Sequence, residues 1–542
     1  MKYTGAKILV ESLQKLGVEC IFGYPGGSIL DIYEELYKVK GKIKHYLMSS
    51  EQGATFAGDG YARASGKVGV VLATSGPGAT NLVTGIANSF LDSVPLVVIT
   101  GNVPTNKLGQ DSFQEVDIYG ITMPVVKYSY LCKRVEDLER IIIDSFEIAK
   151  SGRPGPVLID IPKDILTSKC EYNGNLTAKV HKKEVRIPTD YEKVAEMINQ
   201  STKPFLYCGG GVVNNNCGEK VIKLAELIDA PIACTMMGKT AVPYNCKYNI
   251  GMTGMHGNVG ANNLKNEADL VIALGVRFND RTLRSKQCGQ KIIQVDIDLV
   301  ELDKNVKCDS LIKSDISTFL DNINPYLNSK NNQEWWDEIE LQRQNDYVYN
   351  NDGFTPSNII KSLASNLKTD DIIATDVGQH QLWTAQCYPF VKSKTFLTSC
   401  GLGAMGYGLG ACIGGVIATG KRGVLVTGDG SFAMNNNELA LAVEKKLPIL
   451  IVVMNNGALG MVKQWQTEFY KKHYYGINIS GRVDFELLAK SYGVSKSYSV
   501  DNLQEFQKIL SDVKNFNYPV LINCKISSDE QVLPFVHPDK MW

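Results

Sequence analysis

Two apolar segments in the last third of the chain end in residues that suit a site for a cation and a phosphate group. Residues 423–427 lead into Gly428-Asp429-Gly430, and residues 448–454 lead into Asn455-Asn456. Neighbouring parallel strands would bring Asp429 and Asn456 together at the carboxyl edge of one sheet, where open α/β sheets bind ligands. One carboxylate and one amide oxygen are hard donors for Mg²⁺, and a helix starting after the second glycine would point its N-terminus at a diphosphate. The pattern predicts a parallel α/β sheet with a ligand site at its edge.

The alternation of strand-like and helix-length segments continues through the whole chain in three blocks. Strand-like segments occur at residues 68–74, 95–101, 156–161, 204–208, 231–234, 269–275, 291–296, 371–375, 423–427, 448–454 and 519–524. Such alternation is typical of parallel sheets with helices on both faces. Two polar stretches, 170–188 and 328–352, are expected to be linkers, the second one carrying a surface helix. The sequence therefore predicts an α/β fold of three doubly wound parallel-sheet domains, at residues 1–168, 188–327 and 353–542.

Composition and charge narrow the class of protein. The 542 residues carry 57 basic and 57 acidic side chains, so the formal net charge is zero and no basic surface for nucleic acid is expected. The 13 cysteines are scattered without a C-x-x-C pair, which is typical of reduced thiols in the cytoplasm. The first 16 residues have the spacing of an amphipathic helix, not of a targeting segment, and no apolar stretch is long enough to span a bilayer. We expect a soluble, cytoplasmic protein that binds neither nucleic acid nor membranes.

Short motifs along the whole chain carry a family resemblance. They are Phe22-Gly-Tyr-Pro-Gly-Gly27, Glu51-Gln-Gly53, Gly60-Tyr-Ala-Arg-Ala-Ser-Gly66, Thr74-Ser-Gly-Pro-Gly-Ala-Thr-Asn81, Ser151-Gly-Arg-Pro-Gly-Pro156, Ile161-Pro-Lys-Asp164, Gly254-Met-His-Gly257, Gly275-Val-Arg-Phe-Asn-Asp-Arg281, Gly378-Gln-His-Gln381, Gly401-Leu-Gly-Ala-Met405 and Gly460-Met-Val-Lys-Gln-Trp465. With these motifs the chain resembles thiamine diphosphate-dependent enzymes that decarboxylate pyruvate, and most closely the large catalytic subunits of the acetohydroxyacid synthase (acetolactate synthase) family. The resemblance implies that the first domain binds the pyrimidine ring of the coenzyme, the central domain binds FAD, and the last domain binds the diphosphate. It also implies active sites shared between two chains, hence a homodimer or a tetramer in which two such dimers pair.

The resemblance assigns the residues that bind thiamine diphosphate. Glu51 would hydrogen-bond the aminopyrimidine ring and so activate the coenzyme, which carries the difficult chemistry. Met405 would support the bent form of the coenzyme. Asp429, Asn456 and the backbone carbonyl of Ala458 would bind Mg²⁺. The other expected contacts of the coenzyme are Pro77, Asn81, Gln379, His380, Gly403, Gly428, Gly430, Ser431, Gly460 and Met461.

The central domain of such enzymes binds an FAD that is structural and takes no net part in the reaction. The resemblance places this FAD against Arg153, Gly210, Gly211, Met255, His256, Gly275, Arg277, Asp280, Arg281, Asp296, Ile297 and Asp315. Asn279 stands where the family more often has aspartate, which puts that one contact in question. Arg277, Asp280 and Arg281 around it match the family.

The implied reaction is the decarboxylation of pyruvate and the transfer of the two-carbon unit to a second pyruvate or to 2-oxobutanoate. The products would be acetolactate or acetohydroxybutyrate, in the first common step of branched-chain amino acid biosynthesis. Recognition of the second carboxylate needs a fixed cation, and Arg binds a carboxylate bidentately. Arg281 matches the family's residue in that role, and Trp465 matches the residue that favours 2-oxobutanoate by contact with its extra methyl group. Together with Glu51, Arg281 and Trp465, the expected substrate and catalytic residues are Gly27, Pro104, Phe113, Gln114 and Lys163.

Other functions share the coenzyme and remain as alternatives. A flavin-free catabolic acetolactate synthase makes the same product, but the Arg277–Arg281 and Gly254–Gly257 motifs favour the flavin-containing type. A pyruvate oxidase would use a redox-active flavin. A simple decarboxylase commonly carries adjacent histidines, and none of the six histidines here has a histidine neighbour. A homologue without turnover is disfavoured because Glu51, Asp429 and Asn456 are present.

A separate small regulatory subunit is a further expected partner of this kind of enzyme. The last strand-like segment ends near Ile526, and the tail of residues 527–542 is too short for a fused regulatory domain. The expectation rests on the resemblance.

Overall fold

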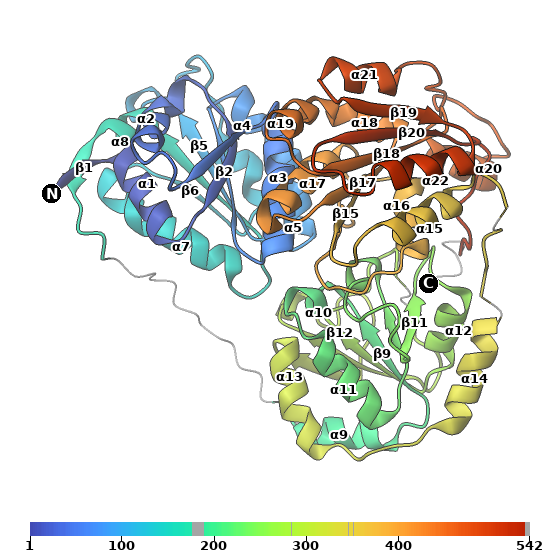
Figure 1. The fold of residues 1–542 in the computed structure, drawn as a ribbon. Coiled ribbons are helices and arrows are strands. Elements are labelled where there is room, and N and C mark those ends of the chain that lie inside the picture. The colour runs from blue at the N-terminus through green and yellow to red at the C-terminus, as the bar shows by residue number, and fades with distance from the viewer. Residues whose placement is uncertain (176–188, 283–284, 345, 351, 537–542) are drawn as a thin grey trace.

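The computed structural model describes residues 1–175, 189–282, 285–344, 346–350 and 352–536, and it consists of three α/β blocks (Figure 1). Each block is built on a six-stranded sheet in which all neighbouring strands are parallel. The predicted fold class is thereby confirmed. Within the described ranges, no helix combines the length and the apolar character that crossing a membrane requires.

The first sheet has the strand order β3-β2-β4-β5-β7-β6. The strands are β2 (Cys20–Tyr24), β3 (Lys44–Leu47), β4 (Gly69–Ala73), β5 (Leu96–Asn102), β6 (Tyr128–Leu131) and β7 (Pro156–Pro162). One face packs on α1 (Gly5–Lys15), α2 (Leu30–Lys38) and α7 (Leu138–Lys150), and the other on α3 (Glu51–Ser65) and α5 (Val83–Leu91). The three segments predicted here as strands are β4, β5 and β7. The edge strands β3 and β6 are partly exposed, so they lack a continuous apolar run.

The central sheet has the order β11-β10-β9-β12-β13-β14. Its strands are β9 (Pro204–Cys208), β10 (Ile232–Cys234), β11 (Asn249–Met252), β12 (Leu270–Leu274), β13 (Lys291–Asp296) and β14 (Ser310–Lys313). The helices α9 (Tyr191–Gln200), α11 (Gly218–Ile228) and α13 (Ile316–Ile323) cover one face, and α12 (Val259–Glu267) and α14 (Gln333–Gln344) cover the other.

The polar stretch at 328–352 contributes to the central block more than a linker would. Its helix α14 buries Trp335, whose indole Nε1 donates a hydrogen bond to the carbonyl oxygen of Pro204 at 3.1 Å. The helix therefore packs on the central sheet, although it lies beyond the predicted boundary at 327. The other predicted linker, 170–188, falls largely on residues outside the described part of the chain; its first residues form β8 (Lys169–Glu171), which pairs antiparallel with β1 (Lys2–Thr4).

The last sheet has the order β16-β15-β17-β18-β20-β19. Its strands are β15 (Ile372–Thr375), β16 (Phe396–Leu397), β17 (Gly423–Gly428), β18 (Ile449–Asn455), β19 (Lys496–Val500) and β20 (Val520–Lys525). The register pairs Gly428 with Met454, so β17 and β18 end side by side. This confirms that the two apolar segments are neighbouring parallel strands.

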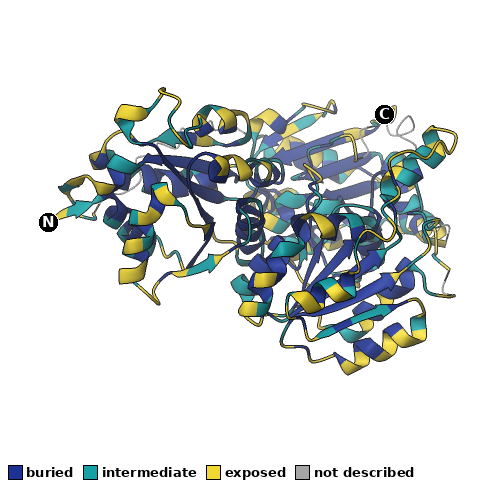
Figure 2. Cartoon of the chain, turned by 90° about the horizontal axis from the view of Figure 1, so that it is seen from above, coloured by how far each residue is buried: buried dark blue, intermediate teal, exposed yellow. Residues whose placement is uncertain are grey.

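The first and last blocks meet where α3 packs on α17 (Tyr407–Thr419) (Figure 1). Glycines make this contact close: a Cβ atom at Gly60 would overlap the carbonyl oxygen of Ala411, and one at Gly414 would overlap that of Ala57. Figure 2 shows the helices at this junction in dark blue, as buried as the strands of the sheets. The two blocks therefore form one packed body within the chain.

We expect Gly414→Ala to lower the free energy of unfolding by about 1–3 kcal/mol, because the added methyl group must separate α3 from α17. Urea denaturation followed by circular dichroism measures this change. Lys421→Ala, at an exposed position just after the same helix, is the control and should change the free energy by less than about 0.5 kcal/mol. Equal effects of the two substitutions would contradict the tight contact.

Candidate coenzyme and substrate site

The carboxyl edge of the last sheet carries a buried, unpaired carboxylate. Asp429 follows β17 directly and begins α18 (Asp429–Asn435). Burial raises the pKa of Asp429 to about 6, and among the described residues no cationic side chain forms an ion pair with it. Asn456 follows β18, and its Oδ1 accepts a hydrogen bond from the backbone N–H of Ala458 at 3.1 Å. A carboxylate, an amide oxygen and a nearby loop carbonyl form a donor set that a divalent cation would stabilise, with room for phosphate oxygens.

Glycines bring backbone close to the side chains around this edge. A Cβ atom at Gly428 would lie 2.9 Å from Nδ1 of His380, and one at Gly460 would lie 2.6 Å from Nδ2 of Asn456. A Cβ atom at Gly430 would lie 3.0 Å from Leu459 Cδ2. Neighbouring side chains therefore leave no space for a larger residue at these positions. The same glycines line a cavity, where backbone can approach a phosphate.

His380 supplies the clearest sign that a ligand fits here. The imidazole is buried, and its Nε2 has no hydrogen-bond partner among the described residues. Burial lowers the pKa of His380 to about 3, so the ring is neutral. Buried polar atoms normally have a partner, and in the neutral tautomer with its proton on Nε2 the ring would donate a hydrogen bond to a phosphate oxygen beside the glycines.

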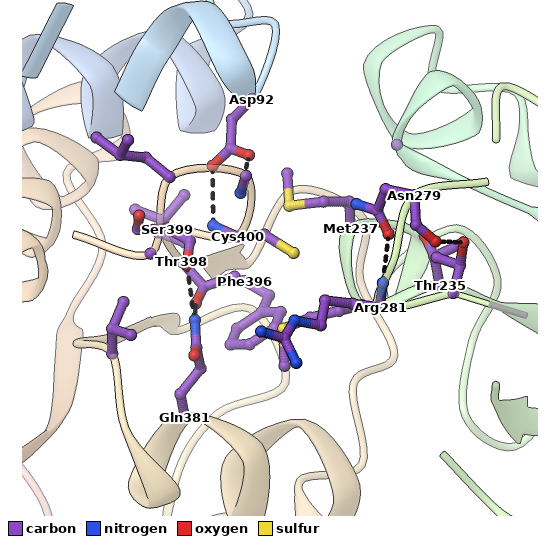
Figure 3. A pocket seen from close by; sticks show the side chains of 18 of the residues that line it. Asp92, Thr235, Met237, Asn279, Arg281, Gln381, Phe396, Thr398, Ser399 and Cys400 are labelled. Carbon is purple, nitrogen blue, oxygen red and sulfur yellow. Dashed lines mark hydrogen bonds between the residues drawn. The ribbon is translucent and has the colours of Figure 1, made fainter. Parts of the chain in front are cut away.

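A cavity of about 990 Å³ opens from this edge and is bounded by all three blocks (Figure 3). In Figure 3, Cys400 and Phe396 of the last block face Arg281 and Asn279 of the central block, with Asp92 of the first block above them. The cavity is lined by these residues predicted to bind thiamine diphosphate or Mg²⁺: Gln379, His380, Gly403, Met405, Gly428, Asp429, Gly430, Ser431, Asn456, Ala458, Gly460 and Met461. It is also lined by Trp465 and by every residue predicted to bind FAD: Arg153, Gly210, Gly211, Met255, His256, Gly275, Arg277, Asp280, Arg281, Asp296, Ile297 and Asp315.

The central wall of the cavity forms at the carboxyl ends of β9, β12 and β13. A Cβ atom at Gly209 would overlap the carbonyl oxygen of Gly275, so the turns after β9 and β12 touch through glycine. Asp296 ends β13, and burial raises its pKa to about 6. Burial lowers the pKa of His256 to about 4, and Nδ1 of this ring has no hydrogen-bond partner among the described residues. A neutral imidazole and a buried acid at strand ends suit a polar, extended ligand.

Arg281 lies between the central wall and α20 (Gly460–Phe469). Its guanidinium carbon is 5.2 Å from the ring centre of Trp465, and its Nη1 lies 3.4 Å from Sδ of Met255. The side chain of Asn279 accepts a hydrogen bond from the backbone N–H of Arg281 at 3.1 Å. The asparagine that departs from the family pattern thus provides an acceptor that holds the loop carrying Arg281.

The remaining predicted site residues lie elsewhere, at the carboxyl edge of the first sheet; we call them the Glu51 set. The set consists of Gly27, Glu51, Pro77, Asn81, Pro104, Phe113, Gln114 and Lys163, and none of these lines the cavity. The Glu51 carboxylate accepts a hydrogen bond from Asn81 Nδ2 at 3.0 Å, and Lys163 Nζ donates to the Gly27 carbonyl at 2.9 Å. Phe113 is 88% exposed. Within one chain the predicted site residues therefore fall into two separate groups, which we call half-sites: the residues that line the cavity and the Glu51 set.

Comparison with known proteins identifies the family of the chain. Models of the thiamine pyrophosphate enzyme match in three parts: the N-terminal TPP binding domain at residues 3–121, the central domain at residues 191–323, and the C-terminal TPP binding domain at residues 376–524. The chain belongs to the thiamine pyrophosphate enzyme family. The resemblance inferred from the motifs is confirmed, and the protein is an enzyme that depends on thiamine diphosphate.

Relatives of this thiamine pyrophosphate enzyme match it over almost its whole length. The chain is 41% identical over 565 residues to the acetolactate synthase large subunit of Porphyra purpurea, covering 99% of the chain and 94% of the relative. It is 40% identical over 567 residues to acetolactate synthase of Arthrospira platensis, covering 99% and 96%. It is 41% identical over 548 residues to the acetolactate synthase isozyme 1 large subunit of Escherichia coli (strain K12), again covering 99% and 96%.

The structure of this enzyme also shows a buried charge network that the sequence did not reveal. Arg63 of α3 pairs with Asp59 at 2.6 Å and with Asp92 at 2.8 Å. The Asp92 carboxylate accepts hydrogen bonds from the backbone N–H groups of Cys400 at 3.0 Å and Gly401 at 2.7 Å (Figure 3). The network holds the loop that leads to Gly403 and Met405. Its signal in the sequence was Arg63 within the Gly60–Gly66 motif, but nothing local indicated its partners.

Proposed function

We propose that the chain is the catalytic subunit of an acetolactate synthase. It decarboxylates pyruvate and transfers the two-carbon unit to a second pyruvate or to 2-oxobutanoate, giving acetolactate or acetohydroxybutyrate for branched-chain amino acid biosynthesis. The names of its relatives support this activity. The observation that carries the proposal is the position of Arg281 on the cavity wall. Among the described residues, the guanidinium of Arg281 forms an ion pair with Asp280 alone, at 3.6 Å.

The position of Arg281 suits the recognition of a second 2-oxo acid. Its side chain is 52% exposed and Asp280 is 60% exposed, so solvent screens their attraction and the guanidinium stays available. Arg binds a carboxylate through two parallel N–H groups, which fixes the orientation of the bound acid. A decarboxylase or an oxidase accepts no second 2-oxo acid and needs no such cation. The indole of Trp465 beside it would contact the alkyl group of the acceptor.

We propose that Asp429, Asn456 and the Ala458 carbonyl bind Mg²⁺, which neutralises the buried charge of Asp429. Bound thiamine diphosphate would supply a nucleophilic thiazolium carbon that attacks the 2-oxo group. His380 and Gln379, the backbone of residues 428–431, and Gly460 would hold the diphosphate. Gly403, Met405 and Met461 would contact the rings of the coenzyme. These assignments rest on the buried donor set, the orphaned His380 Nε2 and the glycine backbone around them.

The separation of the two half-sites supports a homodimer. The Glu51 set lies outside the cavity of its own chain, so a second chain would bring its Glu51, Pro77 and Asn81 to the coenzyme. Glu51 would then hold and move a proton at the aminopyrimidine ring. Gly27, Pro104, Phe113, Gln114 and Lys163 would line the approach of the substrate. Large apolar side chains exposed near this edge, as expected of an interface, are Tyr24, Leu30, Phe113, Ile121 and Met123.

We propose that the central wall binds FAD in a structural role. The cationic Arg153 and Arg277 suit its diphosphate, and Asp296 and Asp315 at the ends of elements suit hydroxyl groups of a ribose or ribityl chain. The tetramer of two paired dimers and the cytoplasmic location stay predictions. Because several relatives are named large subunits, a separate small subunit is also proposed as a partner.

The first test is the product of the reaction. With thiamine diphosphate, Mg²⁺ and FAD, the purified protein should release one CO₂ for each acetolactate formed from pyruvate, and should form acetohydroxybutyrate when 2-oxobutanoate is added. Gas release and product chromatography measure both, and the absorption spectrum shows bound flavin. Free acetaldehyde, or stoichiometric reduction of an electron acceptor, would overturn the proposal in favour of a decarboxylase or an oxidase.

Mixed dimers test whether two chains share one site. Glu51→Gln and Asp429→Ala should each inactivate the homodimer, but co-expressed chains should recover about one quarter of the normal activity. Half of the randomly formed dimers are mixed, and each mixed dimer has one site with an intact Glu51 and an intact Asp429. Co-expression of two differently tagged Glu51→Gln chains is the control and should recover nothing. Mixed dimers without activity would place both residues in the same site of one chain.

Trp465→Leu should retain acetolactate formation while reducing the preference for 2-oxobutanoate by about 10–200-fold, because an apolar contact with one methyl group is worth about 1–3 kcal/mol. Competition between pyruvate and 2-oxobutanoate as acceptors, followed by the ratio of products, measures the preference. Tyr470→Leu, an exposed aromatic residue at the end of the same helix, is the control. An unchanged product ratio in Trp465→Leu would contradict the role of Trp465.

A further inference from the structure

A buried carboxylate outside the cavity contacts the segment that carries Glu51. Glu438 lies in the short 3₁₀ helix η8 (Asn436–Glu438) of the last block, and its side chain is fully buried. Its Oε2 accepts a hydrogen bond from the backbone N–H of Ser49 at 3.0 Å. Its Oε1 accepts from the backbone N–H of Ser50 and from Ser50 Oγ, both at 3.1 Å. One carboxylate thus satisfies three donors from the two residues that precede Glu51.

These donors form the N-terminal end of α3. Ser50 is the N-cap residue, and its Oγ accepts a hydrogen bond from the backbone N–H of Gly53 at 3.0 Å. Ser49 Oγ donates to the carbonyl oxygen of Asn437 at 2.8 Å, which ties the same segment to η8 a second time. Negative charge near a helix N-terminus is favourable because it interacts with the helix dipole. The position of α3 is therefore set by the last block.

Gly53 makes room for this carboxylate. A Cβ atom at position 53 would overlap Oε1 of Glu438. The contact with Glu438 thus explains why residue 53 of the Glu51-Gln-Gly53 motif is a glycine. The role proposed for Glu51 does not explain it.

We propose that Glu438 is a positioning residue for Glu51. Glu438 holds the backbone at Ser49 and Ser50, and it thereby sets the direction in which the Glu51 side chain points from the first turn of α3. The inference rests on the role proposed for Glu51, not on the identity of the second substrate. Asp429 and Glu438 stand at the two ends of one short segment, α18 followed by η8, so this segment contributes to both half-sites of the chain.

Glu438→Gln tests the proposal. Glutamine replaces one of the two carboxylate oxygens by an NH₂ donor, which would face one of the two backbone N–H groups instead of accepting from it. The exchange of the thiazolium C2 proton of bound thiamine diphosphate with deuterium, followed by NMR after acid quench, should slow by about tenfold to hundredfold, because small displacements of a catalytic group have effects of this size. The affinity for thiamine diphosphate and Mg²⁺ should stay unchanged. In the coenzyme-free protein, amide hydrogen exchange in the peptide of residues 47–56 should become faster.

Combination with Glu51→Gln separates positioning from an independent role. The double variant should exchange the C2 proton no more slowly than Glu51→Gln alone, because Glu438 acts through Glu51. Additive losses would overturn the proposal, and so would normal C2 exchange in Glu438→Gln. Since proton exchange needs no second 2-oxo acid, the outcome is independent of whether acetolactate is the product.

Gly53→Ala perturbs the same contact from the side of α3. This variant tests the proposal if Glu438→Gln does not fold. Alanine is favourable within a helix, but its methyl group must displace the flexible end of Glu438 from Ser49 and Ser50. It should therefore slow C2 exchange and speed amide exchange as Glu438→Gln does. Glu444→Gln is the matched control and should change neither rate; Glu444 is an exposed acid in α19 (Leu439–Glu444), the helix that follows η8, and it pairs with Lys445. Normal C2 exchange in Gly53→Ala would overturn the proposal.

Discussion

The close contact between α3 and α17 is the constraint on which both half-sites depend. Two helices of different blocks approach until glycine hydrogens face backbone carbonyl oxygens, which no larger side chain allows. Glu51 begins one of these helices, and the loop carrying Gly403 and Met405 leads into the other. Displacement of either helix would therefore move residues of both half-sites. Arg63, Asp59 and Asp92 tie the far end of α3 to the same loop by buried ion pairs and hydrogen bonds.

The cavity combines several polar groups whose burial is unfavourable in the protein alone. Asp429 and Asp296 have raised pKa values, and His380 and His256 have lowered ones, in each case chiefly because burial disfavours the charged form. Nitrogen atoms of both histidines lack partners among the described residues. A folded protein rarely tolerates such groups unless a ligand satisfies them. This agrees with membership of a family whose domains bind thiamine diphosphate.

Within one chain, different blocks carry different groups of the predicted site residues. All three blocks border the cavity, and the candidate ligands for a cation, a diphosphate and a second carboxylate come from the last and central blocks. The first block presents Glu51 on a different surface, beside exposed apolar side chains. Glu438 shows that the last block also orients Glu51, through hydrogen bonds to the two serines before it. In one chain the Glu51 set thus lies apart from the cavity, and the proposed pairing with a second chain would bring the two together.

Local patterns in the sequence were sufficient to predict the fold class, the central strands and the pairing of β17 with β18. Buried parallel strands are continuous apolar runs, and glycine, aspartate and asparagine at their ends mark the ligand edge. Motifs also named most of the predicted site residues, which the structure places at the carboxyl edges of the three sheets. The helix expected in the polar stretch 328–352 is α14, but its packing on the central sheet was not predicted because few of its side chains, chiefly Trp335 and Ile339, are buried.

Tertiary structure alone decided which distant groups meet. Ser50 and Glu438 are 388 residues apart, and Asp92 and Cys400 are 308 residues apart, so neither contact leaves a periodic pattern in the chain. Sequence patterns also did not predict that the site residues fall into two half-sites. A motif at the end of a strand places its residues at the edge of a sheet, but it does not indicate which sheet edges face each other. The sequence determines local conformation because that depends on side chains that are neighbours along the chain. The close approach of α3 and α17 is seen only in the tertiary structure, where the packed helices leave space for glycine alone.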